Sequence, residues 1–482
     1  MKTEAPGHRP ARARGAAMTA VLGASVLASL DLFIVNLAFP QISRSFSESS
    51  AQELSWVLNA YAVAFAALLA PAGRIADRFG RRSVFRLGLL VFVLGSLLAA
   101  VAPGVAILIA ARAVQGVGAA VIVPTSLALL LASAPADRQK RMVSIWAASG
   151  SAAAALGPAL GGFLAEIDWR WVFAINLPIG ALALILSRSL VGPARKRAGM
   201  PDLIGSLMLA IAVGALVTAL SYWAEWTPAG GRLWITLAIG TAAFIVFVIR
   251  CRRHPVPAID LTLFRSVPFT AAVLGMAAFY TGFSVMLLGG TLWATMIWQW
   301  SPAATGLAFI AGPGTAVVTA LGAGRLKLDA GWFAAIGGAL FLACGALWSS
   351  AMSADSPEPW IFLVGLVLTG AGAGIAQTGF LAGGSRSLAA AEYAAGTGVI
   401  NTARQIGAAL GVAILIMIVG AGDDPAAYLV AWVTMGVAGA GAVLTTLAFL
   451  MPPATRTGAR LVIRSRPADR SPEPPARAIR DW

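Results

Sequence analysis

Long apolar runs recur along almost the whole of this chain and are separated by short polar segments. Each run is close to the length of about 20 residues that an α-helix needs to cross a bilayer. Apolar and polar residues do not alternate within the runs, which favours helices over the strands of a membrane barrel. We count fourteen such runs, at approximately 17–40, 54–73, 83–102, 104–132, 143–165, 171–190, 203–223, 232–250, 268–296, 304–324, 331–351, 360–382, 396–419 and 426–450.

The composition agrees with a polytopic membrane protein. Of the 482 residues, 59% are hydrophobic and only 11% are charged, which lies far outside the range of soluble domains. The predicted fold class is therefore all-α, with fourteen transmembrane helices. Arginine is much more frequent than lysine, and alanine and glycine are abundant, as in proteins from GC-rich bacterial genomes. We therefore expect a protein of the bacterial cytoplasmic membrane.

Basic residues are concentrated in every second loop. They precede the first run and follow the second, fourth, sixth, eighth, tenth and last runs, whereas the alternate loops are mainly acidic. Because cytoplasmic loops of membrane proteins are rich in Lys and Arg, this pattern predicts that both termini are cytoplasmic. The net charge of +15 is thus explained by orientation, and no basic face interleaved with aromatic residues predicts nucleic-acid binding.

A weak internal repeat indicates how the spans are grouped. The second span ends in Gly73-Arg74 and the tenth in Gly324-Arg325, so similar exits recur eight spans apart. Duplicated halves around a central site are typical of secondary transporters. The Pro- and Arg-rich end of the chain is expected to be disordered. The predicted units are a cytoplasmic tail 1–16, a six-helix bundle 17–200, two additional helices with a cytoplasmic linker 201–267, a second six-helix bundle 268–451 and a cytoplasmic tail 452–482.

Asp31 lies inside the first apolar run, where a carboxylate is costly and is by default a proton or ion site. It precedes Pro40, at the outer end of its span, by nine residues, and Arg112 lies eight residues into the fourth span. At 1.5 Å per residue, both side chains are expected ~12 Å from the outer edge. A neighbouring guanidinium lowers the pKa of a carboxylate and desolvation raises it, so a change in their separation would bind or release a proton.

Six short segments combine apolar helical context with glycine, proline and charged residues at fixed spacing. They are Leu30–Pro40, Gly73–Arg82, Arg112–Ala120, Gly157–Gly162, Trp169–Gly180 and Asn401–Gly407. Together they resemble the motifs of the fourteen-span drug:proton antiporters of the major facilitator superfamily, and the resemblance extends to about residue 450. It implies two six-helix bundles with two extra central helices. The exit of the tenth span departs from the motif, because it lacks the full basic run.

The resemblance implies a proton-coupling role for Asp31 and Arg112. The alternative is a static buried ion pair that holds the first and fourth spans together. Gln115 follows Arg112 by about one helical turn and shares its face, so it is expected to complete the hydrogen bonding.

Two motifs are implied to control conformation. The first is expected to latch the cytoplasmic side by pairing across the two halves, unless its charges serve only to set orientation; it contains Gly73, Asp77, Arg78, Gly80 and Arg81. The second is expected to act as a hinge or seal, with ordinary helix packing as the alternative; it contains Gly157, Pro158 and Gly161.

Polar residues of several spans are candidates to line a substrate cavity between the halves. They are Asn36, Gln115, Tyr280, Thr281, Ser284, Asn401, Arg404 and Gln405. The hydroxyl groups could equally bond within their own helices. For Arg404, cavity lining and structural pairing are equally compatible with the sequence.

The predicted function is that of a proton-coupled antiporter exporting lipophilic small molecules such as drugs, antibiotics or secondary metabolites. Asp31 is the only deep carboxylate, whereas Arg112 and Arg404 are basic, so neutral or weakly acidic substrates are expected. Alternatives are an exporter dedicated to one metabolite or siderophore, a proton symporter, and a membrane receptor or scaffold.

No Walker motif, metal-ligand cluster or catalytic cluster is evident, so we expect no enzyme activity, no metal site and no cofactor other than the proton gradient. The expected partners are a small lipophilic substrate, protons and the lipid bilayer. We expect the protein to act as a monomer.

Overall fold

The computed structural model describes residues 11–132, 134, 138–190, 199–226, 230–323, 328–389 and 392–450. These residues form helices and loops, and 14 of the helical segments are long and apolar enough to cross a membrane. The predicted all-α class with fourteen spans is therefore confirmed. The predicted tail 452–482, residues 1–10 of the N-terminal tail and the Gly324-Arg325 exit lie outside the described residues, and the predicted unit boundaries stay predictions.

The first bundle contains the helices up to residue 189. They are α1 Ala11–Ser45, α2 Ala51–Phe79, α3 Arg81–Ala100, α4 Val105–Ala132, α5 Gln139–Ile167, α6 Trp171–Ala174, α7 Asn176–Leu186 and the 3-10 turn η2 Ser187–Ser189. Helices α2, α3 and α4 pack side by side, and α1 packs against α5 and α7. This bundle holds both Asp31 and Arg112.

The second bundle begins after a short linker. Its elements are the 3-10 turn η4 Leu261–Arg265, α10 Val267–Leu292, the π-helix η5 Trp293–Ile297, α11 Pro302–Ala308, α12 Ala311–Ala323, α13 Ala330–Ala351, α14 Pro359–Arg386, α15 Tyr393–Val419 and α16 Pro425–Leu450. Here α13 packs against α14 and α16, and α10 against α15 and α16.

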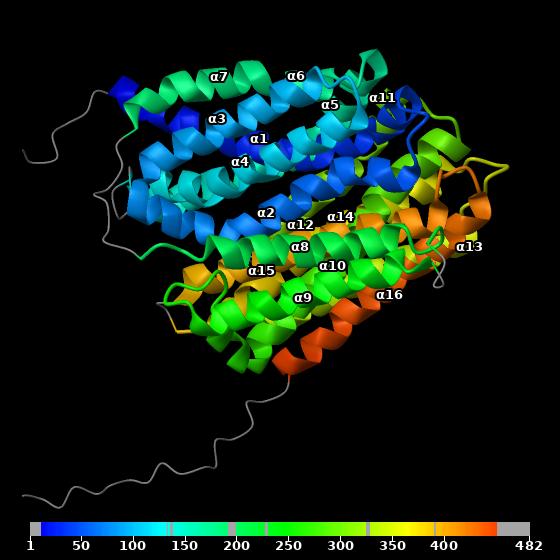
Figure 1. Cartoon of the computed structure of the whole chain (residues 1–482). Helices are drawn as coiled ribbons and strands as arrows, with labels where there is room; N and C mark the ends of the chain where they lie inside the picture. The colour runs from blue at the N-terminus through cyan, green and yellow to red at the C-terminus, as the bar shows by residue number, and fades with distance from the viewer. Residues whose placement is uncertain are drawn as a thin grey trace, which may run out of the picture.

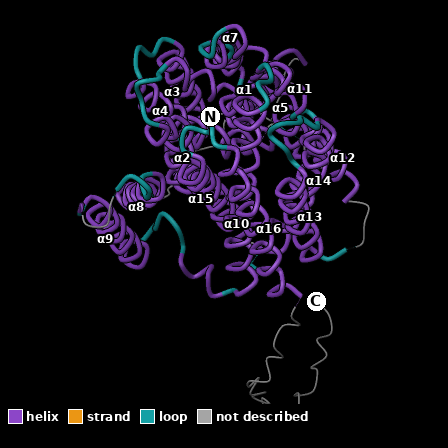
Figure 2. The backbone as a smooth tube through the Cα atoms, turned by 90° about the vertical axis from the view of Figure 1, so that its right-hand side faces the viewer, coloured by secondary structure: helices purple, strands orange, loops and turns teal. Residues whose placement is uncertain are grey.

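Two further helices, α8 Leu203–Ser221 and α9 Arg232–Arg253, connect the bundles in sequence. Figure 1 shows the first bundle, in blue to blue-green, lying beside the second, in green to red. Seen roughly along the helix axes in Figure 2, α8 and α9 lie to one side, where α8 covers the junction of α2 with α15. The bundles also meet through α5 with α11 and through α1 with α10.

Two spans that the sequence predicts as continuous helices are interrupted. The sixth span divides into α6 and α7 near Ile175, and the tenth into α11 and α12 near Ile310. Pro178 and Pro313 explain these breaks, because proline lacks an N–H and its ring clashes with the carbonyl of the preceding turn. The first span tolerates Pro40 inside α1 and continues to Ser45, beyond its predicted end.

Asp202 fixes the start of α8 against the end of α9. Its carboxylate accepts hydrogen bonds from the Gly205 N–H at 2.8 Å and from the Arg250 guanidinium at 2.6 Å. Burial raises the pKa of Asp202, but the bonds from Arg250 and Gly205 outweigh that effect and leave the pKa below its ordinary value. A lowered carboxylate pKa stabilises the folded state above the unfolded pKa, and the stabilisation is lost as the pH falls through the folded pKa.

We therefore expect Asp202→Asn to destabilise the protein by about 1–3 kcal/mol at neutral pH, because the charged hydrogen bonds are lost. Thermal unfolding of both proteins in detergent, followed by fluorescence from neutral pH to below about 3.9, measures this difference. The wild-type advantage should shrink as the acid range is entered. The matched control is Asp424→Asn. The Asp424 carboxylate is exposed and, among the described residues, accepts only from the nearby Ala426 N–H. A difference between wild type and Asp202→Asn that is independent of pH would contradict the assignment.

Candidate functional site

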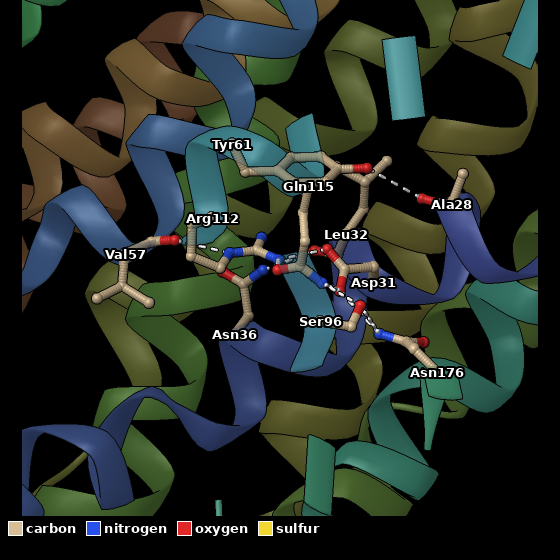
Figure 3. A network of polar contacts seen from close by, with 10 residues as sticks. All are labelled: Ala28, Asp31, Leu32, Asn36, Val57, Tyr61, Ser96, Arg112, Gln115 and Asn176. Carbon is tan, nitrogen blue, oxygen red and sulfur yellow. Dashed lines mark hydrogen bonds and ion pairs between the residues drawn. The ribbon is translucent and has the colours of Figure 1, made fainter. Parts of the chain in front are cut away.

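A buried ion pair joins the first and fourth spans, as the sequence predicts. Nη1 of Arg112 donates to Oδ2 of Asp31 at 2.5 Å, and the exposed fractions of the two residues are 2% and 0%. Gln115 accepts from Arg112 at 2.9 Å and donates to the other oxygen of Asp31 at 3.2 Å. Gln115 therefore completes the hydrogen bonding in the predicted way (Figure 3).

The network extends to residues that the sequence did not single out. Asn176 donates to Asp31 and to Ser96, both at 3.3 Å, and Ser96 also accepts from Gln115 at 2.7 Å. All three partners of Asp31 are thus supplied by other helices, namely α4 and α7 (Figure 3). The sequence offers a signal for Asn176, because an amide side chain within an apolar run is unusual. It offers none for Ser96, because single serines are common in membrane helices.

Arg112 is held on its other side by α2. Its Nε donates to the carbonyl of Val57 at 2.9 Å, and its guanidinium lies 4.5 Å from the ring centroid of Tyr61. Glycine permits this proximity, because a Cβ on Gly116 would meet the Tyr61 carbonyl oxygen at 2.5 Å. The glycine of this motif therefore brings α4 close enough to α2 for Arg112 to bind its backbone.

A cavity of about 1840 Å³ lies between the two bundles. Arg112 forms part of its wall, and the fully buried Asp31 lies behind Arg112. The cavity reaches the end of the protein where α2 meets α3 at Gly80, which we call the basic end. Six of the predicted cavity residues line it, namely Asn36, Tyr280, Ser284, Asn401, Arg404 and Gln405.

Two predicted cavity residues are placed elsewhere. Gln115 is fully buried and points into the Asp31 network, where its amide oxygen accepts from Arg112 and its amide nitrogen donates to Ser96. Thr281 donates to the carbonyl of Ala277 at 3.0 Å and to that of Gly407 at 3.1 Å, so its hydroxyl serves the contact between α10 and α15. The cavity assignment of both residues is corrected accordingly.

Arg404 lies further from the start of its helix than the sequence predicted, because α15 begins at Tyr393 and not at residue 396. Its guanidinium lies 5.4 Å from the ring centroid of Tyr280, whose hydroxyl donates to Gln377 at 3.1 Å. Of the two interpretations left open by the sequence, the structure favours cavity lining. The contact with an aromatic face partly compensates for the burial of the cation.

At the end opposite the basic end, the Gly157–Gly162 segment of α5 brings the bundles into contact. A Cβ on Gly157 would meet Phe33 at 2.9 Å, and one on Gly161 would meet the Ile34 carbonyl at 2.7 Å, so these two glycines face α1 within the same bundle. Pro158 and Gly162 instead face α11 of the other bundle. There the Glu166 carboxylate also accepts from the Ala303 N–H at 3.0 Å.

The Gly73–Arg82 segment forms part of the mouth of the cavity at the basic end. Gly80 ends α2 with φ of 98°, a conformation in which glycine avoids the strain of a side chain. Gly73, Asp77 and Arg81 line the mouth. Arg81 pairs with Asp77 at 2.8 Å within this segment, and the Arg78 guanidinium lies 5.6 Å from the Phe79 ring.

The contacts of three neighbouring arginines lie within the first bundle or reach the linker, and the expected pairing of the cluster across the two halves stays a prediction. Arg82 donates to the Arg188 carbonyl at 2.8 Å and Arg86 to the Ser187 hydroxyl at 3.0 Å, both in the first bundle. Arg74 reaches further and donates to the Pro257 carbonyl in the linker. The cavity opens between the halves at this end, so these contacts form beside its mouth.

A sequence profile of the Major Facilitator Superfamily matches residues 21–412. The chain belongs to this superfamily. Its members are transporters, and together with the 14 apolar helices this makes the chain a multi-pass membrane protein. The resemblance carried by the six sequence motifs is therefore confirmed.

Several relatives within the superfamily have names that refer to resistance. The chain is 34% identical to "Multidrug resistance protein Stp" of Mycobacterium tuberculosis over 394 residues, covering 80% of this chain and 72% of that protein. It is 35% identical to "Puromycin resistance protein pur8" of Streptomyces alboniger over 412 residues, covering 83% and 80%. It is 30% identical to "Methylenomycin A resistance protein" of Streptomyces coelicolor over 418 residues, covering 85% and 86%.

Solved structures of two transporters share the fold at low sequence identity. A peptide transporter determined in complex with sulfate aligns with a TM-score of 0.66 at 15% identity, covering 90% of this chain and 93% of that one. The D-xylose-proton symporter aligns with a TM-score of 0.62 at 15% identity, covering 90% and 96%. At this identity the similarity establishes the architecture only.

Proposed function

We propose that the protein is a proton-coupled antiporter that exports lipophilic small molecules from the bacterial cytoplasm as a monomer. The observation that carries this proposal is the position of Asp31. It is a fully buried carboxylate whose partner, Arg112, forms part of the wall of the cavity. Export, and not import, is supported by the resistance names of the relatives.

The basic end is proposed to face the cytoplasm, because Lys and Arg are enriched in cytoplasmic loops. With this orientation the cavity opens to the cytoplasm, and the contact of Pro158 and Gly162 with α11 closes the outer side. Such a conformation would take up substrate from the cell. A second conformation, with the outer contact open, would release it.

Protonation of Asp31 would drive the return step. In the ionised state its oxygens accept from Arg112, Gln115 and Asn176, which satisfies the negative charge. A proton removes the partner of the Arg112 cation, and leaving a buried charge unpaired costs about 3–5 kcal/mol. Arg112 must therefore move or become hydrated, and either change alters the cavity wall and favours a different arrangement of α1 and α4.

The proton gradient is the proposed energy source, and no cofactor is invoked. Fluorescent dye extrusion from energised vesicles of an efflux-deficient host that expresses the protein tests this. Extrusion should fall to the level of vesicles without the protein when an exchanger of K⁺ for H⁺ collapses the pH gradient. Unchanged extrusion after that collapse would overturn proton coupling.

A resistance panel in the same host tests the substrate class. Because Arg112 and Arg404 line the cavity, expression should protect the host better against neutral or weakly acidic lipophiles than against cations. We expect expression to protect against methylenomycin A about tenfold more than against ethidium or benzalkonium, a discrimination of about 1.4 kcal/mol. Stronger protection against the quaternary ammonium compounds would contradict the expected charge preference.

A further inference from the structure

Four buried side-chain atoms beside the cavity have no hydrogen-bond partner among the described residues. They are both amide atoms of Asn59, the amide nitrogen of Gln405 and Nε of Arg404, and all three residues belong to the cavity wall. Asn59 is 0% and Gln405 2% exposed. Buried polar groups are almost always hydrogen-bonded, so several open ones beside one cavity call for an explanation.

Other polar residues of the same wall satisfy themselves within their helices. The amide of Asn36 donates to the Leu32 carbonyl at 2.8 Å, and that of Asn401 donates to the Thr397 carbonyl at 2.9 Å. An asparagine facing this cavity can therefore bond to the preceding turn of its own helix. Asn59 makes no such bond, so its open amide is a property of this position.

The three residues are close together on two facing helices. Asn59 belongs to α2, and Arg404 and Gln405 belong to α15, which packs against α2 in the opposite direction. The hydrogen bond from Thr402 to the Ala66 carbonyl, at 3.3 Å, shows which residues of the two helices lie opposite each other. From this register, Gln405 lies beside residue 63, and Asn59 lies four residues further from the basic end, or about 6 Å along the axis.

We propose that Asn59, Gln405 and Arg404 form the polar subsite that selects the exported compound, and that it takes lipophilic molecules carrying a carbonyl oxygen. This inference rests on the proposed export function and names the chemistry of its substrate. Three of the four open atoms are N–H donors, which require an acceptor such as a ketone, lactone or amide oxygen. The apolar side chains around them, including Leu58, Ala62 and Val412, would enclose the rest of the molecule.

The role is one of specificity. A site built to hydrogen-bond one group of a ligand discriminates against the analogue that lacks the group, because the donors of the site are then left unpaired. All three residues lie in the wall of the cavity, so a ligand that fills the cavity lies beside the donors that they carry.

Binding of a matched pair of probes tests the subsite. Fluorenone and fluorene differ only in a carbonyl group against a methylene group, and equilibrium dialysis against protein in nanodiscs, corrected with empty nanodiscs, measures both. We expect the wild type to bind fluorenone at least tenfold more tightly than fluorene. In Asn59→Leu and in Gln405→Leu this ratio should fall to near one, with the affinity for fluorene retained.

Thr402→Val is the matched control, because it removes a satisfied hydrogen bond of the same pair of helices without altering the subsite. Its fluorenone preference should equal that of the wild type. Equal binding of the two probes by the wild type, no saturable binding of fluorenone, or a preference that survives in both leucine variants would overturn the inference. The assay uses no pH gradient, so a failure of proton coupling would leave its result unaffected.

Discussion

Replacing Asp31 with Asn is expected to reduce export driven by a pH gradient to background, a loss of at least about 100-fold, or 2.7 kcal/mol of coupling. The substitution keeps the shape of the side chain and an oxygen that can accept from Arg112, but it removes the carboxylate that is proposed to carry the proton. The two conformations then respond equally to protons, and a ligand without differential affinity shifts no equilibrium. Purified protein in liposomes with an imposed pH gradient provides the measurement.

The loss should be confined to coupling. Exchange of labelled for unlabelled substrate needs no net proton movement, so Asp31→Asn is expected to retain it, which also demonstrates a folded and inserted protein. Asp260→Asn is the matched control, since this carboxylate lines the cavity mouth but bonds to Thr262 of its own turn. Export that still follows the pH gradient in the Asp31 variant would refute the proposed role of this residue.

The pairing of Asp31 with Arg112 was predictable because two strong signals coincide. Charges inside apolar runs are rare, and counting residues from the ends of the runs gives their depth in the membrane. Neither step needs tertiary information, so the sequence predicted that the two side chains lie at one level. The fourteen spans were also predictable without tertiary information, because apolar runs of this length and continuity do not occur repeatedly in soluble proteins.

The partners of this pair were less predictable, because they depend on how the helices are rotated about their axes. Ser96 and Asn176 reach the network from α3 and α7, and Gln115 turns away from the cavity although it shares a face with Arg112. The open amide of Asn59 is likewise visible only once α15 is placed beside α2. Residue type identifies a polar group, whereas its partner is decided by packing.

The conformation is also not predictable from the sequence, because in the proposed mechanism the same chain forms two arrangements of its halves. Gly157, Pro158 and Gly161 were predicted as a hinge or seal. The structure divides this segment between two neighbours, with glycines facing α1 and Pro158 facing α11. Gly162 follows directly and contacts the other bundle, so the effect of a substitution should depend strongly on which of these adjacent glycines is changed.

Gly162→Leu is expected to open the outer side of the transporter. A Cβ at this position would meet the Pro302 carbonyl, and Gly306 opposite it leaves no flexible side chain that could move away. Overpacking of this kind costs about 1–3 kcal/mol, and only in the conformation in which α5 and α11 touch. The equilibrium should therefore move by about 5- to 150-fold toward the conformation with a separated outer contact.

Labelling of a single cysteine in the cavity measures this shift. Leu58 lines the cavity toward its closed end, and the native cysteines Cys251 and Cys344, both buried, are first replaced by alanine. A membrane-impermeant maleimide added to intact cells should modify Leu58→Cys faster in the Gly162→Leu background than in its absence. Gly314→Leu is the matched control, because a Cβ there meets no atom within 4 Å among the described residues. Equal labelling rates with and without Gly162→Leu would mean that the contact of α5 with α11 does not hold the outer side closed.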